Sequence, residues 1–331
     1  MTLDQTRSRL ERYLARHHPE QPAQSLGSLV ALSGGWASDL YTFTLHRAGS
    51  GGGLATTSVL KMYAPDARGR EHATREWRAL TGLRAVGHPV PRAVLLELDA
   101  RHLGHPFIVM DHVPGNSFWQ AIEAAGPVDR ILLTRSFVAK LVALHALDPH
   151  LLEPAADLTD PYSHIERELE KLRRDSASCP NVVPAQVVRW LERRRRDVPC
   201  ERPVILHRDY HPWNVLLDEA ERLWVVDWDW SVGDARFDLA WTCTLMRRSG
   251  FHTFSSAVRD EYVHQSNRPL DHLAYFEVLT TVRWLLNVLP PAQPDARSDA
   301  AARANFEAFL VEPVGQARAL LREHTGVGLP D

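Results

Sequence analysis

Cysteine is scarce in this chain, and the residues that occur show no pairing pattern. The three cysteines, Cys179, Cys200 and Cys243, are odd in number, widely spaced and free of any CxxC motif. Such spacing indicates neither a disulfide framework nor a zinc site. We therefore expect a protein of the reducing cytoplasm.

Long apolar runs and an excess of charge of one sign are also missing. No run of about 18 apolar residues occurs, and the N-terminal stretch is charged at helical spacing, so we expect no membrane partner and no export signal. The formal net charge is only -3. Because nucleic-acid binders neutralise phosphates with Lys and Arg, this balance predicts no nucleic-acid partner.

The motifs of several common enzyme classes are absent. Neither GxGxxG after a strand nor GxxxxGKS/T occurs, and HExxH and GxSxG are missing as well. These absences disfavour a dinucleotide-binding dehydrogenase and a P-loop enzyme. With 331 residues, the chain is nevertheless long enough for two packed structural units.

The hydrophobic pattern divides the chain into a β-rich part and a helical part. Helical spacing is expected over 3–17 and 70–83, and alternating patterns predict strands at 29–35, 39–47, 56–64, 92–98 and 106–113. After Pro114 and Gly115 the pattern becomes mainly helical. We therefore predict an α+β fold with two lobes, a β-rich N-lobe over 1–112 and a helical C-lobe over 113–331.

The stretch VILHRDYHPWNVLL, residues 204–217, carries the strongest chemical signal. An apolar strand leads into a loop with Asp209, and Asn214 follows five residues later. In kinase-type phosphoryl transfer, an aspartate orients the attacking hydroxyl and an asparagine a few residues later binds Mg²⁺. Asp227, after a second apolar strand, is the expected second Mg²⁺ ligand. An ordinary turn is the alternative interpretation of the loop residues.

Two further residues near this motif have open roles. On strand alternation, Asp229 shares a face with Asp227, which predicts a second metal ligand or a substrate contact, with a solvated carboxylate as the alternative. Trp213 either contacts the acceptor or packs. Asp234 and Asp238 are interpreted as structural, in a turn and at a helix N-cap.

Lys61 lies inside the apolar stretch SVLKMY, where its charge needs a partner. Glu76 on the following helix is the expected partner, in the pairing that holds a lysine against nucleotide phosphates, and Glu71 is the rival. An exposed lysine on an edge strand is the alternative. Upstream, a predicted turn contains Ser33, Gly34, Gly35 and Ser38. Its backbone amides could cover phosphate oxygens, although a plain hairpin explains the turn nearly as well.

Taken together, these stretches resemble the aminoglycoside phosphotransferase family, which is related to choline kinases. The resemblance rests on LSGGWASDLYTF, SVLKMY, FIVMDHVPG, KLVALHALD, HRDYHPWNVLL and VVDWDWSVGDARFDLAW. It implies a protein-kinase-like fold in which the backbone of Asp111 and Val113 binds the nucleotide base and Met110 lines the base pocket. One departure is Arg208, where the family usually has glycine.

The resemblance implies a Mg²⁺-dependent phosphotransferase that uses ATP or GTP and modifies a hydroxyl of a small molecule. The acceptor stays open among aminoglycosides, macrolides, sugars and amino alcohols, and so does a role in antibiotic resistance. A group of acidic residues suggests a cationic acceptor: Asp157, Asp160, Glu166, Glu168 and Glu170. Basic residues are interleaved with them, which favours a solvated helix face instead. A non-catalytic nucleotide-binding scaffold and a protein kinase are the alternatives, and we expect a monomer or homodimer.

Overall fold

The computed structural model describes residues 2–17, 24–32, 38–47, 55–179, 181–289 and 300–328. The chain divides into two compact units, each built from two separate stretches of sequence. The first consists of Met1–Phe118 and Asn214–Trp230, and the second of Trp119–Trp213 and Ser231–Asp331. The first unit therefore contains the expected N-lobe together with the segment that carries Asn214 and Asp227.

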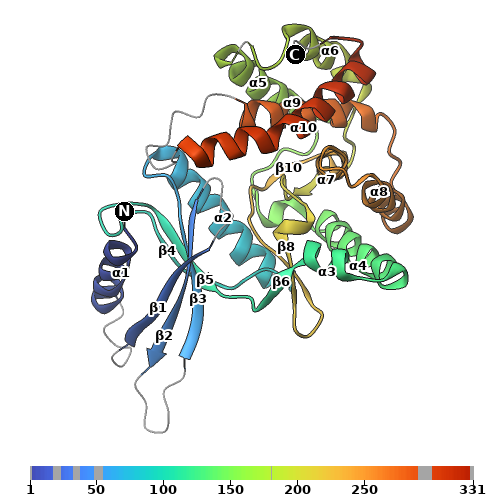
Figure 1. Ribbon diagram of the computed structural model, residues 1–331. Coiled ribbons are helices and arrows are strands. Elements are labelled where there is room, and N and C mark those ends of the chain that lie inside the picture. The colour runs from blue at the N-terminus through green and yellow to red at the C-terminus, as the bar shows by residue number, and fades with distance from the viewer. Residues whose placement is uncertain are drawn as a thin grey trace. The chain divides into compact units, whose positions relative to one another are not determined.

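An antiparallel sheet forms the centre of the first unit (Figure 1). Its strands are β1 (Gln24–Leu32), β2 (Asp39–Arg47), β3 (Ala55–Met62), β4 (Ala93–Glu97) and β5 (Phe107–Asp111), in the spatial order β1-β2-β3-β5-β4. All five correspond to predicted strands. Because β3 lies in the middle of the sheet, Lys61 is opposite Leu40 on one side and Ile108 on the other, which excludes an edge-strand lysine.

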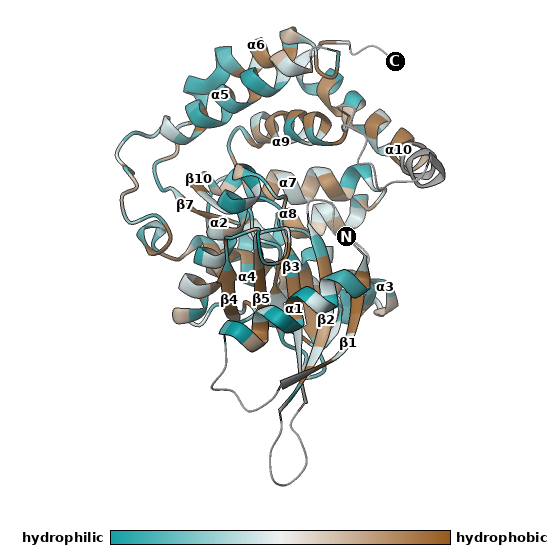
Figure 2. Cartoon of the chain, turned by 90° about the vertical axis from the view of Figure 1, so that its left-hand side faces the viewer, coloured by the Kyte–Doolittle hydropathy of each residue, from teal (hydrophilic) through white to brown (hydrophobic). Residues whose placement is uncertain are grey.

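Two helices accompany this sheet. Helix α1 (Leu3–His17) buries Leu10 and Tyr13 in the same apolar core as Phe107 of β5, and Figure 2 shows its polar colouring beside the brown strands. Helix α2 (Ala67–Ala85) begins after Asp66, whose carboxylate accepts a hydrogen bond from the backbone N–H of Gly69. Such a cap satisfies an N–H that the first helical turn leaves without a partner.

A small second sheet completes the first unit. It contains β6 (Gly115–Ser117), β8 (Val215–Asp218) and β9 (Leu223–Val225), in the order β6-β8-β9. Strand β9 ends at Val225, so Asp227 and Asp229 lie after the strand rather than on it, and Asp227 has a positive φ of 63°. The strand-alternation argument for Asp229 is therefore wrong, because no strand runs through these residues.

The second unit is mainly helical, in agreement with the sequence pattern. Its helices are α3 (Phe118–Ala124), α4 (Pro127–His145), α5 (Ser163–Ser178), α6 (Ala185–Arg194), α7 (Ala235–Arg248), α8 (His252–Ser266), α9 (Leu273–Val288) and α10 (Ala300–Thr325). Short 3-10 turns occur at Pro149–Leu151 and Arg195–Asp197, and a third at Pro212–Asn214 leads into the first unit. Among the described residues, no helix combines the length and apolarity needed to cross a membrane.

A short strand pair positions the loop that contains Asp209. Strand β7 (Val204–Leu206) is antiparallel to β10 (Ser231–Gly233), and all three residues of β7 are buried. The loop leaves directly from the end of β7. Its first residues therefore start from a fixed, buried position.

Candidate active site

Lys61 is the centre of a buried ion cluster in the first unit. Its Nζ lies 2.6 Å from Glu76 Oε2 and 2.6 Å from Asp227 Oδ1. The Lys61 and Glu76 side chains are only 4% and 2% exposed, whereas Asp227 is 52% exposed. The pairing with Glu76 predicted from sequence is thus present, while Glu71 is exposed.

The neighbours of Lys61 keep it charged. Burial alone would lower the pKa of the Lys61 ammonium, but the carboxylates of Asp227 and Glu76 outweigh burial and raise it. The Tyr63 hydroxyl donates a second hydrogen bond to Glu76 Oε2, at 2.7 Å. The cluster therefore presents a fixed positive charge beside a half-exposed carboxylate, an arrangement suited to a polyphosphate and a cation.

Asn214 and Asp227 belong to the same end of the β8–β9 hairpin. Val215 is opposite Val225 in the ladder, and the backbone N–H of Val226 donates to the Asn214 carbonyl at 3.0 Å. One side chain offers an amide oxygen and the other carboxylate oxygens. Hard oxygen ligands of this kind fit Mg²⁺, which is commonly held by one or two protein groups together with substrate phosphates.

Asp229 has a different environment from Asp227. Asp229 lies near Arg75 of α2, whose Nη2 is 3.9 Å from Asp229 Oδ1. Arg75 also donates to the carbonyl of Trp230, and the Trp230 indole donates to the Arg75 carbonyl at 2.7 Å. Asp229 is 40% exposed, so its pairing with Arg75 is weak and the carboxylate faces solvent.

In the second unit, one buried carboxylate holds the backbone of the loop after β7. Asp238 of α7 accepts the N–H of His207 at 2.7 Å and the N–H of Arg208 at 2.8 Å, one on each oxygen. His145 contacts the same carboxylate at 3.2 Å. Asp238 is therefore not a helix N-cap as expected, since Asp234 caps α7 by accepting the N–H of Arg236.

Asp209 follows these two anchored residues. Its Oδ1 accepts the indole N–H of Trp241 at 2.8 Å and lies 3.3 Å from His211 Nε2. Burial alone would raise the pKa of the Asp209 carboxyl, but its electrostatic interaction and hydrogen bond with His211, together with the interactions with His207 and Arg283, lower it below its usual range. Asp209 is thus an oriented, ionised carboxylate at neutral pH.

The backbone and the side chain of Arg208 have opposite requirements. Its φ of 73° lies in the left-handed region, where glycine is favoured, which accounts for the glycine usual in the family that the sequence resembles. The guanidinium instead forms a bidentate ion pair with Glu168 of α5, with its Nη1 2.5 Å from Oε1. Burial would raise the pKa of Glu168, but Arg208 lowers it to about 2.

The expected nucleotide-binding turn falls mostly outside the described residues. Ser33, Gly34 and Gly35 are not described, whereas Ser38 lies in a bend just before β2.

The expected base-binding segment is described throughout. Met110 is buried on β5. The N–H of Asp111 donates to the Arg92 carbonyl at 2.9 Å, so a base contact from Asp111 has to use its carbonyl oxygen. Val113 follows in an irregular segment of intermediate exposure.

Trp213 packs within the second unit. Its ring lies 5.3 Å from that of Trp119 and 6.4 Å from that of Phe251, and the residue is still 38% exposed. These ring contacts agree with the interpretation that Trp213 packs against its neighbours. Its exposed part leaves room for a contact with a ligand.

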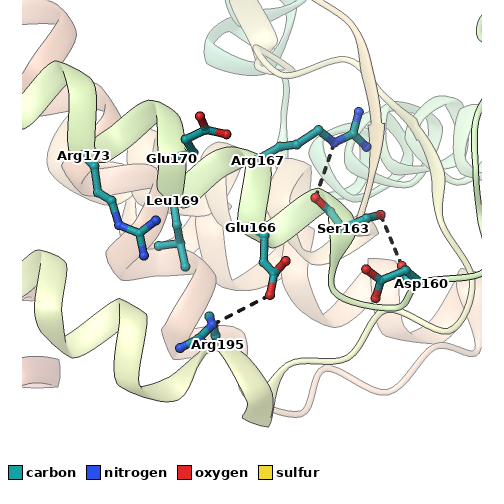
Figure 3. A pocket seen from close by; sticks show the side chains of 8 residues that line it. All are labelled: Asp160, Ser163, Glu166, Arg167, Leu169, Glu170, Arg173 and Arg195. Atoms are coloured by element: carbon teal, nitrogen blue, oxygen red, sulfur yellow. Dashed lines mark hydrogen bonds and ion pairs between the residues drawn. The ribbon is translucent and has the colours of Figure 1, made fainter.

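The acidic residues of α5 are mostly matched by arginines. Glu166 and Glu170 border a surface pocket of about 500 Å³ with Arg167, Arg173 and Arg195 (Figure 3). Glu166 pairs with Arg195 and Arg196, and Glu170 pairs with Arg174. Because these charges compensate one another, the pocket offers little net attraction for a cationic acceptor.

Several residues around Asp209 were not identified from sequence. Trp241 and Arg283 come from α7 and α9, and Arg283 donates to the Arg208 carbonyl at 3.0 Å. Arg248 is buried against Trp241 and Trp284, and burial lowers its pKa to about 9. Of these residues, only Trp241 lies in a stretch that the family resemblance includes, VGDARFDLAW, which also contains Asp238.

The fold and these residues define a phosphotransferase of the kinase-like class. More specifically, the chain belongs to the APH family, described as the phosphotransferase enzyme family, whose model matches residues 28–308. The expected family and the expected two-lobed, protein-kinase-like α+β fold are thereby confirmed.

Similar proteins include a curated relative and solved structures. Acyl-CoA dehydrogenase family member 11 from Gallus gallus is 29% identical over 239 residues, which cover 70% of this chain but only 30% of the relative. The chain therefore spans less than a third of that relative's length.

Two solved structures share the fold at low sequence identity. One is a protein from Ralstonia eutropha described as an aminoglycoside phosphotransferase, with a TM-score of 0.66, 17% identity and coverage of 96% of this chain and 98% of that chain. The other is a thermostable mutant of aminoglycoside phosphotransferase APH(4)-Ia in complex with AMP-PNP and hygromycin B, with a TM-score of 0.58, 15% identity and coverage of 96% and 99%.

Proposed function

We propose that this protein transfers the γ-phosphoryl group of ATP or GTP to a hydroxyl of a small molecule in the cytoplasm. The observation that carries the proposal is the buried cluster of Lys61, Glu76 and Asp227, because it holds a charged ammonium group beside a half-exposed carboxylate, the pair that a nucleoside triphosphate with its Mg²⁺ requires. The complex of APH(4)-Ia with AMP-PNP supports a nucleoside triphosphate donor.

Each proposed role follows from the chemistry of a side chain. Lys61, oriented by Glu76, binds the α- and β-phosphates, and Asn214 and Asp227 hold Mg²⁺. When bound, Mg²⁺ neutralises charge on the phosphates. The backbone at Ser33, Gly34, Gly35 and Ser38 covers the phosphates, and Met110, Asp111 and Val113 contact the base.

Asp209 orients the acceptor hydroxyl and takes up its proton late in the transfer. Its lowered pKa makes it a weak base. A weak base suffices, because phosphoryl transfer passes through a loose transition state with little bond formation to the nucleophile. Trp213 and Asp229 are the proposed acceptor contacts, with Asp229 as an alternative second metal ligand.

The first experiment measures Mg²⁺-dependent release of ADP or GDP across a panel of aminoglycosides, macrolides, amino alcohols and sugars. Asp209→Ala serves as the inactive control, and Asp227→Ala is expected to abolish metal-dependent nucleotide binding. A hit that disappears in Asp209→Ala identifies the reaction and the acceptor class. Nucleotide binding without turnover on any acceptor would favour the non-catalytic scaffold, and phosphorylation of a protein substrate alone would favour a protein kinase.

A further inference from the structure

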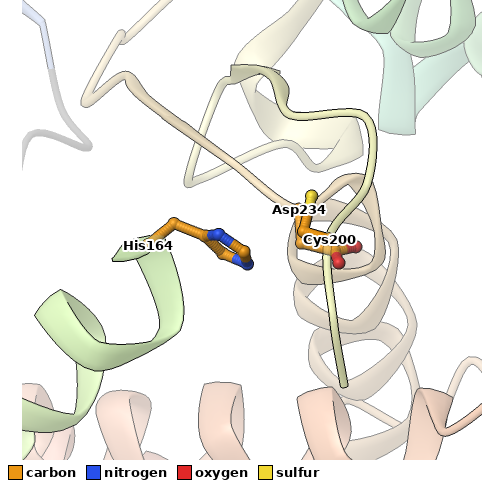
Figure 4. Close-up of side chains that lie close together, drawn as sticks. All are labelled: His164, Cys200 and Asp234. Carbon is orange, nitrogen blue, oxygen red and sulfur yellow. The ribbon is translucent and has the colours of Figure 1, made fainter. Parts of the chain in front are cut away.

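Three side chains of the types that bind metals converge in the second unit. His164 is in the first turn of α5, Cys200 precedes β7, and Asp234 caps α7 (Figure 4). One ligand atom from each lies within 4.8 Å of those of the other two. All three residues are buried, at 7%, 5% and 5% exposure.

His164 supplies an independent indication of a ligand. Both of its ring nitrogens are buried and have no hydrogen-bond partner among the described residues. An unsatisfied buried polar group costs about 1–3 kcal/mol, so a native histidine of this kind calls for an unseen partner.

We propose that His164, Cys200 and Asp234 form a zinc-binding site in the second unit, with water as the fourth ligand. A nitrogen, a sulfur and a carboxylate oxygen are the ligand types of Zn²⁺. With Zn–S of about 2.3 Å and Zn–N of about 2.0 Å, tetrahedral ligands are about 3.5 Å apart, so the cluster contracts by only about one ångström on binding.

The surroundings of the cluster fit the charge of the ion. Asp234 already accepts hydrogen bonds from Arg236, with Nε 3.0 Å from Oδ1 and Nη2 2.6 Å from Oδ2, so it serves as a single-oxygen ligand oriented by that arginine. Zinc binds the deprotonated Cys200 thiolate, so one proton is released for each ion bound.

The site would fasten three segments around the β7–β10 pair. Cys200 is four residues before β7, its N–H donates to the Pro161 carbonyl at 2.9 Å, and Asp234 follows β10 directly. Since the Asp209 loop leaves from β7, the ion would stabilise the base of that loop without touching it.

Sequence spacing gave no indication of this site. The ligands come from positions 164, 200 and 234, and no pair has the short spacing of a zinc motif.

The test uses untagged full-length protein purified without chelator. We expect about one zinc per chain by elemental analysis, and a fall in the melting temperature after a zinc chelator that added zinc reverses. Cobalt replacement should give a thiolate-to-cobalt charge-transfer band in the near ultraviolet. Cobalt at Asn214 and Asp227 cannot give this band, because those ligands contain no sulfur.

Cysteine variants assign the band. Cys200→Ser should abolish it, whereas Cys243→Ser, which removes another buried cysteine of the same unit, should leave it intact. His164→Gln should lower zinc content at least about tenfold. Wild-type protein without zinc and without a chelator effect, or a cobalt band unchanged in Cys200→Ser, would overturn the proposal and leave a hydrogen-bonded core cluster.

Discussion

The Lys61 cluster and the Asp209 loop achieve fixed geometry in opposite ways. Around Lys61, charged side chains from a strand, a helix and a hairpin end hold one another directly. Around Asp209, the backbone is held first, by the two N–H bonds to Asp238, and the side chain is then oriented by Trp241. The first arrangement depends on charge balance, and the second on the position of a single buried carboxylate.

The largest expected effect tests the catalytic side of this comparison. Asp209→Ala should lower kcat by roughly 10²- to 10⁴-fold, the usual contribution of a positioned base. Nucleotide binding should stay nearly unchanged, because the proposed nucleotide contacts do not include Asp209. Steady-state kinetics and nucleotide titration measure the two quantities. Full turnover in Asp209→Ala would show that the base is assigned wrongly, and exposed Asp260→Ala on α8 is the matched control.

Breaking the charge balance around Lys61 should produce the next largest effect. Lys61→Met leaves Glu76 buried without its cation, so we expect a loss of about 3–5 kcal/mol in the free energy of unfolding. Lys61→Met combined with Glu76→Gln should lose less than the sum of the single variants. Urea unfolding measures the double-mutant cycle.

An exposed ion pair of the same unit provides the control for that cycle. Arg92 and Asp111 are 58% and 42% exposed, and their coupling should be about 0–1 kcal/mol. Equal coupling in the two pairs would contradict the role assigned to burial.

Arg208→Gly should have an intermediate effect, because two contributions oppose each other. Glycine relieves a left-handed backbone strain of about 1–2 kcal/mol, but Glu168 loses its bidentate partner. We expect a net loss of about 1–3 kcal/mol in unfolding free energy, partly restored by adding Glu168→Gln. A stabilised Arg208→Gly single variant would show that the ion pair contributes little.

The smallest effect is a pH dependence from Glu168. Its pKa is lowered to about 2 in the folded protein from 4.5 for an ordinary glutamate, so it stabilises the fold above about pH 4.5 and loses that contribution as the pH falls towards 2. The stability difference between wild type and Glu168→Gln should be constant from about pH 7 to pH 5 and shrink below that. A difference that instead grows below pH 4.5 would contradict this sign.

Much of the fold and several site residues were predictable from sequence. The five strands, the helix that carries Glu76 and the helical second half follow from local hydrophobic periodicity. Asp209, Asn214 and Asp227 could be named as candidates because each lies in a motif that follows a short apolar strand and spans only a few residues. Their catalytic roles stay predictions.

The sequence by itself thus determined the local elements and the motif residues, since both depend on neighbours a few positions apart. Only the tertiary structure decided that Lys61 meets Asp227, 166 positions away, that Asp238 holds the loop rather than capping a helix, and that Arg208 pairs with Glu168. The physical reason is that such contacts depend on how distant segments pack. The partner of a buried charged side chain is therefore set by the tertiary fold and not by its neighbours in sequence.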